Sequence, residues 1–158
     1  HDRMVADHRA AAQGGEADHA GFALKGVLKL ELESLGYAPL DLGTHDTASV
    51  DYPDYADKLA QAIKAGKAAR GVLVCGTGIG MSIAANRHPG IRCGLVHDAT
   101  GARLARAHND ANVVAMGARM TGVEPALDAL RTFLATPYEG GRHDRRVAKL
   151  TPAMEPAR

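Results

Sequence analysis

The chain has 158 residues, and its 19 Lys and Arg against 18 Asp and Glu leave a formal net charge of +1. This length suits one α/β domain and is too short for two of ordinary size. No run of about 18 apolar residues occurs, which excludes a membrane-spanning helix, and the amino-terminal residues lack the apolar segment of a secretory signal. Near-neutral charge gives no global attraction to nucleic acid, so we expect a cytoplasmic protein that binds neither membranes nor nucleic acid.

The amino-terminal part of the chain predicts a tail, a strand and a helix. Residues 1–9 are expected to be a tail. Residues 10–17 should supply the first strand of a parallel sheet, although they lack the β-branched residues that such strands favour. The triplet Ala-Asp-His occurs at 6–8 and again at 17–19, and the glycine and amphipathic run after the second copy favour it as the functional one. Residues 22–35 have helical spacing and stop at Gly36.

The rest of the chain alternates strands with helices. We expect strands at 37–42, 71–75, 91–96 and 112–116, and helices at 53–65, 81–86, 100–108 and 123–134. This alternation predicts a doubly wound parallel sheet in a single domain over residues 10–150. A basic helix at 142–150 and a carboxyl-terminal tail at 151–158 follow. In such sheets, ligands bind at the carboxyl ends of the strands.

The most informative stretch is the glycine-rich turn from Cys75 to Gly80, which follows an apolar strand and precedes a helix. Its backbone N–H groups and the positive end of the helix would stabilise negative charge beside the thiol. Cys75 could simply close the strand as a small apolar residue, but this environment favours a thiolate that acts as a base. A dinucleotide fingerprint needs glycine where Met81 stands, and a P-loop needs Gly-Lys-Ser/Thr. An anion hole suited to an enediolate therefore remains.

Other candidate residues are ambiguous when each is taken alone. A histidine such as His108 at a helix end is favourable to the dipole without further function, and the pair at 18–19 could cap a helix. Arg142 and Arg146 share one helical face and could grip a phosphate, or could belong to a solvated basic helix. Cys93 is interpreted as a core residue. The remaining histidines lack metal-ligand spacing, so the sequence predicts no metal and no cofactor.

Five motifs in order make the chain resemble ribose-5-phosphate isomerase type B, a family grouped with the galactose-6-phosphate isomerase subunits. The resemblance spans residues 18–150. The motifs are Asp18 to Lys25, Asp51 to Ala56, Cys75 to Asn86, His108 to Asn112 and Tyr138 to His143.

The resemblance implies a Rossmann-like three-layer α/β/α domain that performs metal-free aldose–ketose isomerisation through an enediolate. It also implies a homodimer or homotetramer with active sites shared between subunits. Cys75 would be the base that moves a proton between C1 and C2, and His108 would open the sugar ring. Thr77 and the backbone of Gly76, Gly78, Ile79 and Gly80 would hold the enediolate oxygens, and Asp18 would bind or polarise the sugar oxygens near the reacting carbons. Asn109 would hold a hydroxyl group. The phosphate end would be bound by His19, Arg119, Arg142 and Arg146.

We therefore expect interconversion of ribose 5-phosphate and ribulose 5-phosphate. A tetrose or hexose phosphate is the alternative substrate, and a non-catalytic sugar-phosphate-binding protein is the alternative class. The binding protein is suggested by one departure from the family: Gln13 and Glu16 stand where an apolar strand is normal. A thiol base argues against it, because pure binding does not need one.

Overall fold

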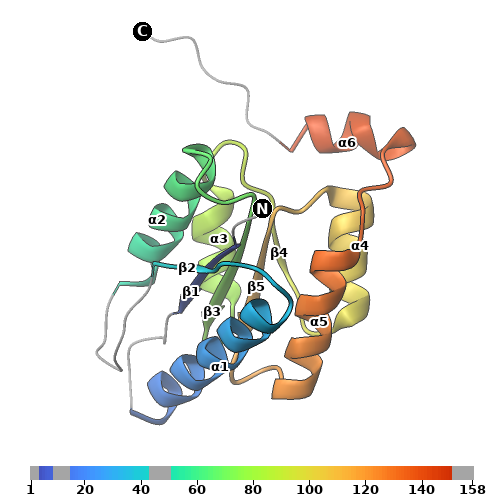
Figure 1. Cartoon of the computed structure of the whole chain (residues 1–158). Helices are drawn as coiled ribbons and strands as arrows, with labels where there is room; N and C mark the ends of the chain where they lie inside the picture. The colour runs from blue at the N-terminus through green and yellow to red at the C-terminus, as the bar shows by residue number, and fades with distance from the viewer. Residues whose placement is uncertain (1–3, 9–14, 43–50, 151–158) are drawn as a thin grey trace, which may run out of the picture.

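A computed structural model describes residues 4–8, 15–42 and 51–150, with the backbone alone at 4–8 and 15–20. Strands and helices alternate through most of the described chain (Figure 1). The strands are β1 Met4–His8, β2 Leu40–Asp41, β3 Arg70–Cys75, β4 Cys93–Leu95 and β5 Val113–Gly117. The helices are α1 Gly15–Ser34, α2 Tyr52–Lys64, α3 Ile79–Asn86, α4 Ala99–Asn109, α5 Val123–Ala135, the 3-10 turn η1 Gly141–His143 and α6 Asp144–Ala148.

The described strands form one parallel sheet in the order β2-β1-β3-β5-β4. The chain moves outward in one direction from β1 to β2, and β3 then pairs with the other edge of β1. The carboxyl ends of β1 and β3 therefore flank the point at which the winding direction changes, where doubly wound sheets bind their ligands. Cys75 ends β3 at this point.

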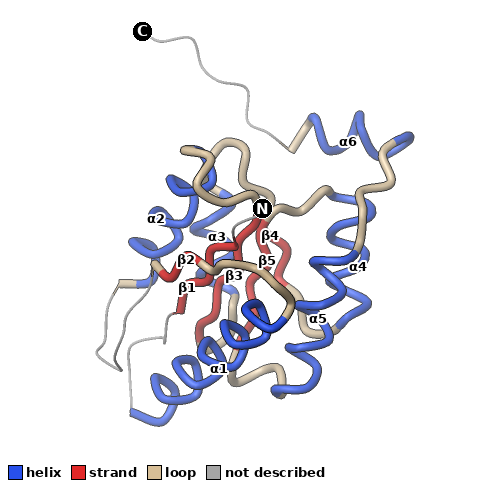
Figure 2. Tube along the Cα trace, viewed as in Figure 1, coloured by secondary structure: helices blue, strands red, loops and turns tan. Residues whose placement is uncertain are grey.

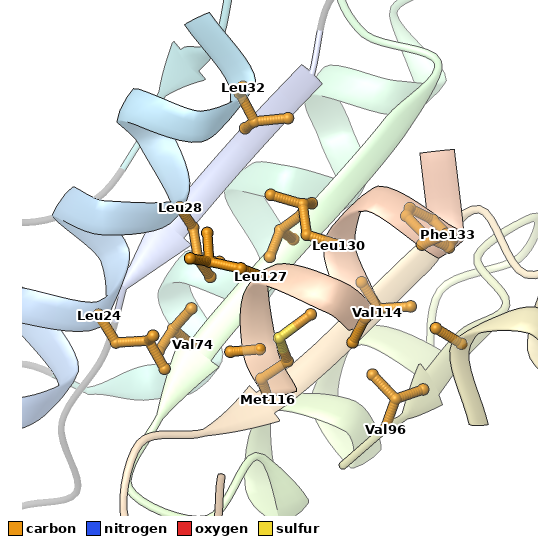
Figure 3. Close-up of a cluster of buried hydrophobic side chains, with 14 of the residues drawn as sticks. Leu24, Leu28, Leu32, Val74, Val96, Val114, Met116, Leu127, Leu130 and Phe133 are labelled. Atoms are coloured by element: carbon orange, nitrogen blue, oxygen red, sulfur yellow. The ribbon is translucent and has the colours of Figure 1, made fainter. Parts of the chain in front are cut away.

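Helices cover both faces of the sheet, which gives three layers (Figure 2). Alternate residues of β3 point to opposite faces, as strand geometry requires: Val72 and Val74 meet α1 and α5, whereas Leu73 and Cys75 meet α2 and α3. Figure 3 shows the cluster on the face covered by α1 and α5, in which leucines of α1 lie beside α5 over the same face of the strands. Its labelled residues are Leu24, Leu28, Leu32, Val74, Val96, Val114, Met116, Leu127, Leu130 and Phe133.

The predicted fold class is confirmed, and most element positions agree within a few residues. Gly36 and Gly66 end α1 and α2 with φ of 88° and 72°, the left-handed conformation that favours glycine. The predicted strand at 37–42 is shortened to the two residues of β2. Among the described residues, no helix is both long and apolar enough to cross a membrane.

The amino-terminal prediction is wrong in its placement of the first strand. The first described strand is Met4–His8, inside the expected tail. Of the predicted strand at 10–17, residues 10–14 lie outside the described residues, and residues 15–17 belong to α1. Met4 and Val5 supply the larger apolar residues that a strand between two neighbours needs, and the alanine- and glycine-rich stretch after residue 9 does not. As a result, Asp18 and His19 lie in α1 and not directly after a strand, while the first Ala-Asp-His triplet ends β1.

Candidate active site

The thiol of Cys75 is buried at the carboxyl end of β3 and is held by the turn that follows it. The backbone N–H of Gly78 donates to Cys75 Sγ at 2.9 Å. Ile79 begins α3 immediately afterwards, so the positive end of this helix lies beside the sulfur. A donated hydrogen bond and a helix N-terminus are two of the features by which proteins stabilise a thiolate. The arrangement can therefore supply a base next to a set of N–H donors.

Glycines are needed in this turn because backbone segments meet there. Gly78 has a φ of 78°, and a Cβ on it would lie 2.7 Å from Leu95 Cδ1 and 3.0 Å from the carbonyl carbon of Met116. The loop after β5 is bonded to the turn: the N–H of Ala118 donates to Cys75 O at 2.8 Å, and that of Arg119 to Gly76 O at 2.9 Å. The turn after Cys75 is thus fixed by the ends of two strands, β3 and β5.

Gly117→Ala should disrupt this site, because its Cβ would lie 2.5 Å from the carbonyl carbon and oxygen of Thr77, and backbone cannot swing aside as a side chain can. We expect a loss of about 1–3 kcal/mol in the free energy of unfolding, as for other overpacked sites, together with loss of activity. Denaturant unfolding measures the first. The control is Gly26→Ala on the exposed side of α1, where a Cβ meets nothing within 4 Å and should be neutral or stabilising. Equal stability of both variants would contradict the close packing of the turn.

Two more predicted residues, Thr77 and Arg119, lie at the turn, and a further residue was missed. Thr77 is half-buried, and its Oγ1 accepts from the N–H of Ile79 at 3.3 Å. Arg119 is exposed in the loop that binds Gly76. The residue that sequence reasoning missed is Tyr52, whose ring lies so near Gly80 that a Cβ there would be 2.8 Å from Tyr52 Cζ. Its only signal was its place in the second motif, residues 51–56.

His108 and Asn109 lie near the amino ends of the strands, whereas Cys75 lies at the carboxyl end of β3. They end α4, which begins just after β4 and returns to the amino end of β5 (Figure 1). A five-residue parallel strand such as β5 is roughly 16 Å long. This length separates the amino ends of the strands, near His108, from the carboxyl ends, near Cys75. The described part of one chain therefore does not bring these two residues together.

Asp110 fixes the end of α4 that carries His108 and Asn109. It is the only described non-glycine residue with positive φ, 47°, a conformation that costs roughly 1–2 kcal/mol unless something holds it. Two arginines hold it: Arg106 Nη1 lies 2.9 Å from Oδ1, and Arg92 Nη2 lies 3.1 Å from Oδ2. Arg106 is itself buried and also donates to Ala111 O at 2.7 Å.

The loop after α5 covers the same end of α4. The N–H of Glu139 donates to Ala107 O at 3.1 Å, and the Tyr138 hydroxyl donates to Asp144 Oδ1 at 2.8 Å. Burial and this carboxylate raise the pKa of Tyr138 to about 12, so it remains a donor at neutral pH. The loop leads into η1 and α6, which carry exposed Arg142 and Arg146. These arginines therefore lie at the same end of the molecule as His108, whereas Arg119 lies beside the turn that follows Cys75.

Comparison with known proteins identifies the family. A family model described as Ribose/Galactose Isomerase matches residues 16–150. The chain belongs to this family. Ribose-5-phosphate isomerase B of Escherichia coli is 43% identical over 134 residues, which are 85% of this chain and 90% of that protein.

Solved structures agree with the family assignment. A ribose 5-phosphate isomerase from Thermotoga maritima has a TM-score of 0.86 at 45% identity, with 97% of this chain and 100% of that one covered. The type B ribose 5-phosphate isomerase of Trypanosoma cruzi has a TM-score of 0.83 at 42% identity, with 95% of each chain covered. The range matched by the ribose/galactose isomerase model includes Asp18 and His19 and excludes the first Ala-Asp-His triplet. The resemblance inferred from five motifs is therefore confirmed.

Proposed function

We propose that this member of the ribose/galactose isomerase family interconverts ribose 5-phosphate and ribulose 5-phosphate. The observation that carries the proposal is the buried Cys75 thiol, which accepts the Gly78 N–H inside a glycine turn at a helix N-terminus. The E. coli and T. maritima relatives are named for this substrate. The proposal also depends on the family match, because a thiol beside an anion hole could serve other acyl or carbonyl chemistry.

In the proposed reaction, the Cys75 thiolate removes the proton from C2 of the open-chain aldose, and the C–H electron pair forms the C1–C2 double bond of an enediolate. The negative charge that develops on the C1 oxygen is stabilised by N–H donors of the turn from Gly76 to Gly80 and by Thr77. The proton of the C2 hydroxyl passes to the C1 oxygen, and the same thiol returns its own proton to C1, so that C1 carries a hydroxyl and the C2 oxygen becomes the ketone carbonyl. Asp18 would orient the two oxygens. The positioned thiolate accepts the carbon-bound proton, and the preorganised donors stabilise the negative charge that its removal leaves on oxygen.

We further propose that a second copy of the chain completes each active site, because His108 and Asn109 lie at the edge of the sheet opposite to Cys75. An exposed apolar surface on α3 and β4 suits such a partner. Ile79 and Ile83 of α3 are 49% and 62% exposed, and Leu95 is exposed on the short edge strand β4. A two-fold axis across α3 would place the Cys75 end of one chain beside the His108 end of its partner.

In this arrangement, the phosphate end of the sugar would be bound by Arg142 and Arg146 of the chain that supplies His108, together with His19 and Arg119. Charge-assisted hydrogen bonds at a distant phosphate hold the carbon skeleton over the thiolate, so binding energy far from the reacting carbons lowers the barrier.

Arg142→Ala should reduce kcat/KM on ribose 5-phosphate by about 10- to 100-fold, the loss expected for one charged hydrogen bond of roughly 1.5–3 kcal/mol. Arg142 is exposed, so the free energy of unfolding should be unchanged. Arg103, an exposed arginine on α4, provides the matched control as Arg103→Ala. Equal kcat/KM for the Arg142 variant and the wild type would contradict the phosphate role.

The test of the proposed function is a coupled assay of purified protein on ribose 5-phosphate with tetrose and hexose phosphates in the same panel. We expect the highest kcat/KM on the pentose phosphate. Preference for another sugar phosphate would correct the substrate and keep the reaction. Binding of sugar phosphates by folded protein without turnover of any of them would replace the isomerase with a binding protein.

A further inference from the structure

Two histidines and a glutamate from three separate segments converge at the amino edge of the sheet. His108 ends α4, Glu139 lies in the loop after α5, and His143 ends η1. One ligand atom from each lies within 4.8 Å of the other two. The two imidazole rings are stacked, with centroids 4.5 Å apart and 16° between the ring planes.

His143 Nε2 is the buried member of this cluster. The side chain is 8% exposed, and Nε2 has no hydrogen-bond partner in the described part of the chain. Glu139 Oε2 is 3.5 Å from it without hydrogen-bond geometry, and the same oxygen is 3.9 Å from His108 Nε2. Leaving a buried polar atom unsatisfied typically costs about 1–3 kcal/mol, so such an atom calls for an explanation.

We propose that His108, Glu139 and His143 form a binding site for a divalent transition-metal ion of the zinc type. Two imidazole nitrogens and a carboxylate oxygen bind zinc-type ions in preference to Mg²⁺ or Ca²⁺, which prefer sites made of oxygen ligands alone. Glu139 is 56% exposed, which leaves one side of the cluster accessible to a water ligand. Neutral histidines are required, so protons would compete with the ion at low pH.

The stacked rings define the movement that binding requires. A metal ion lies in the plane of each imidazole that binds it, and two nearly parallel rings cannot both meet this condition at one point. One ring must therefore turn. His108 has more freedom, since its side chain is 37% exposed and that of His143 is only 8% exposed. Binding would thus unstack the rings and withdraw His108 from its present position.

The consequence for activity rests on the proposed function, although the site itself does not. A metal-bound His108 cannot exchange a proton with the ring oxygen of the sugar. The ion would then be a reversible inhibitor of isomerisation that starts from the closed ring, and a chelator would restore the rate.

Zn²⁺ affinity measured by competition with a chromophoric chelator, without any sugar, tests the site directly. All proteins would carry Cys75→Ser so that this thiol cannot bind the ion. We expect His143→Gln and Glu139→Gln to weaken binding at least about tenfold, since even outer-shell partners of a metal are worth 10- to 100-fold. The matched control is His88→Gln, which removes a histidine paired with Asp57 at 2.6 Å and should leave the affinity unchanged. Histidines 1, 8, 19, 45 and 97 are present in every protein, so they cancel in the comparison.

Co²⁺ absorption supplies a readout that does not depend on whether the variants fold. The parent protein should show the d–d bands of four-coordinate Co²⁺ with no thiolate charge-transfer band. A charge-transfer band would move the site to Cys93 and overturn the proposal. Equal Zn²⁺ affinities of the parent and the two folded cluster variants would also overturn it. Because no sugar is present in either measurement, these outcomes do not depend on whether the protein is an isomerase.

Discussion

Cys75→Ser should reduce kcat on ribose 5-phosphate by at least about 100-fold, within the 10²- to 10⁴-fold range for a positioned general base. Serine has nearly the shape of cysteine and can still accept the Gly78 N–H, so the turn should persist. A serine hydroxyl, however, does not ionise near neutral pH and cannot replace the thiolate. The measurement is a coupled assay on protein whose thermal unfolding matches that of the wild type.

Cys93→Ser provides the matched control because the chain has only these two cysteines. Burial raises the pKa of Cys93 to about 12, so this thiol stays protonated and unreactive at neutral pH. Its replacement should leave kcat unchanged. Alkylation by iodoacetamide should accordingly inactivate the wild type and the Cys93 variant alike. Wild-type kcat in folded Cys75→Ser protein would remove the thiol from the mechanism.

The Cys75 turn could be predicted from sequence because its determinants are local. An apolar strand, glycines at alternate positions and a helix lie within 16 consecutive residues, and the backbone contacts of Gly78 and Gly117 show why those glycines are needed. The central strands β3 and β5 were equally clear, because β5 is buried throughout and β3 is buried and uncharged after its first residue, Arg70.

Features set by tertiary contacts could not be predicted in this way. The first strand was misplaced because neither candidate segment is strongly apolar; Met4 and Val5 give only a weak local signal, and the pairing with Leu40 and with β3 establishes the strand. The cluster of His108, Glu139 and His143 depends on a loop that folds back onto α4 over 30 residues later. Its one local signal was the four-residue spacing of Glu139 and His143. The sequence also placed His108 and Cys75 in one site without showing that they lie at opposite edges of the sheet.

Mixing two inactive variants should restore activity if each active site takes Cys75 from one chain and His108 from another. Cys75→Ser and His108→Asn should each be nearly inactive on the closed-ring substrate. In a mixed dimer, one site would lack both groups, and the other would have Cys75 from the His108 variant and His108 from the Cys75 variant. Random exchange makes half of all dimers mixed, so about one quarter of wild-type activity should return in a two-fold dimer.

The experiment requires chain exchange, which can be achieved by joint refolding or by coexpression with two different affinity tags. The control is a mixture of Cys75→Ser with Thr77→Val, whose altered residues lie on the same turn and therefore in the same half of the site. Each mixed dimer of that pair still has one defect in every site, so it should recover nothing beyond the activity of its parents. Failure of the first mixture, in exchanged dimers shown to contain both chains, would mean that His108 acts elsewhere. Recovery beyond the parents in both mixtures would show that Cys75 and Thr77 serve different active sites, whereas full activity of Thr77→Val alone would limit the anion hole to backbone N–H groups.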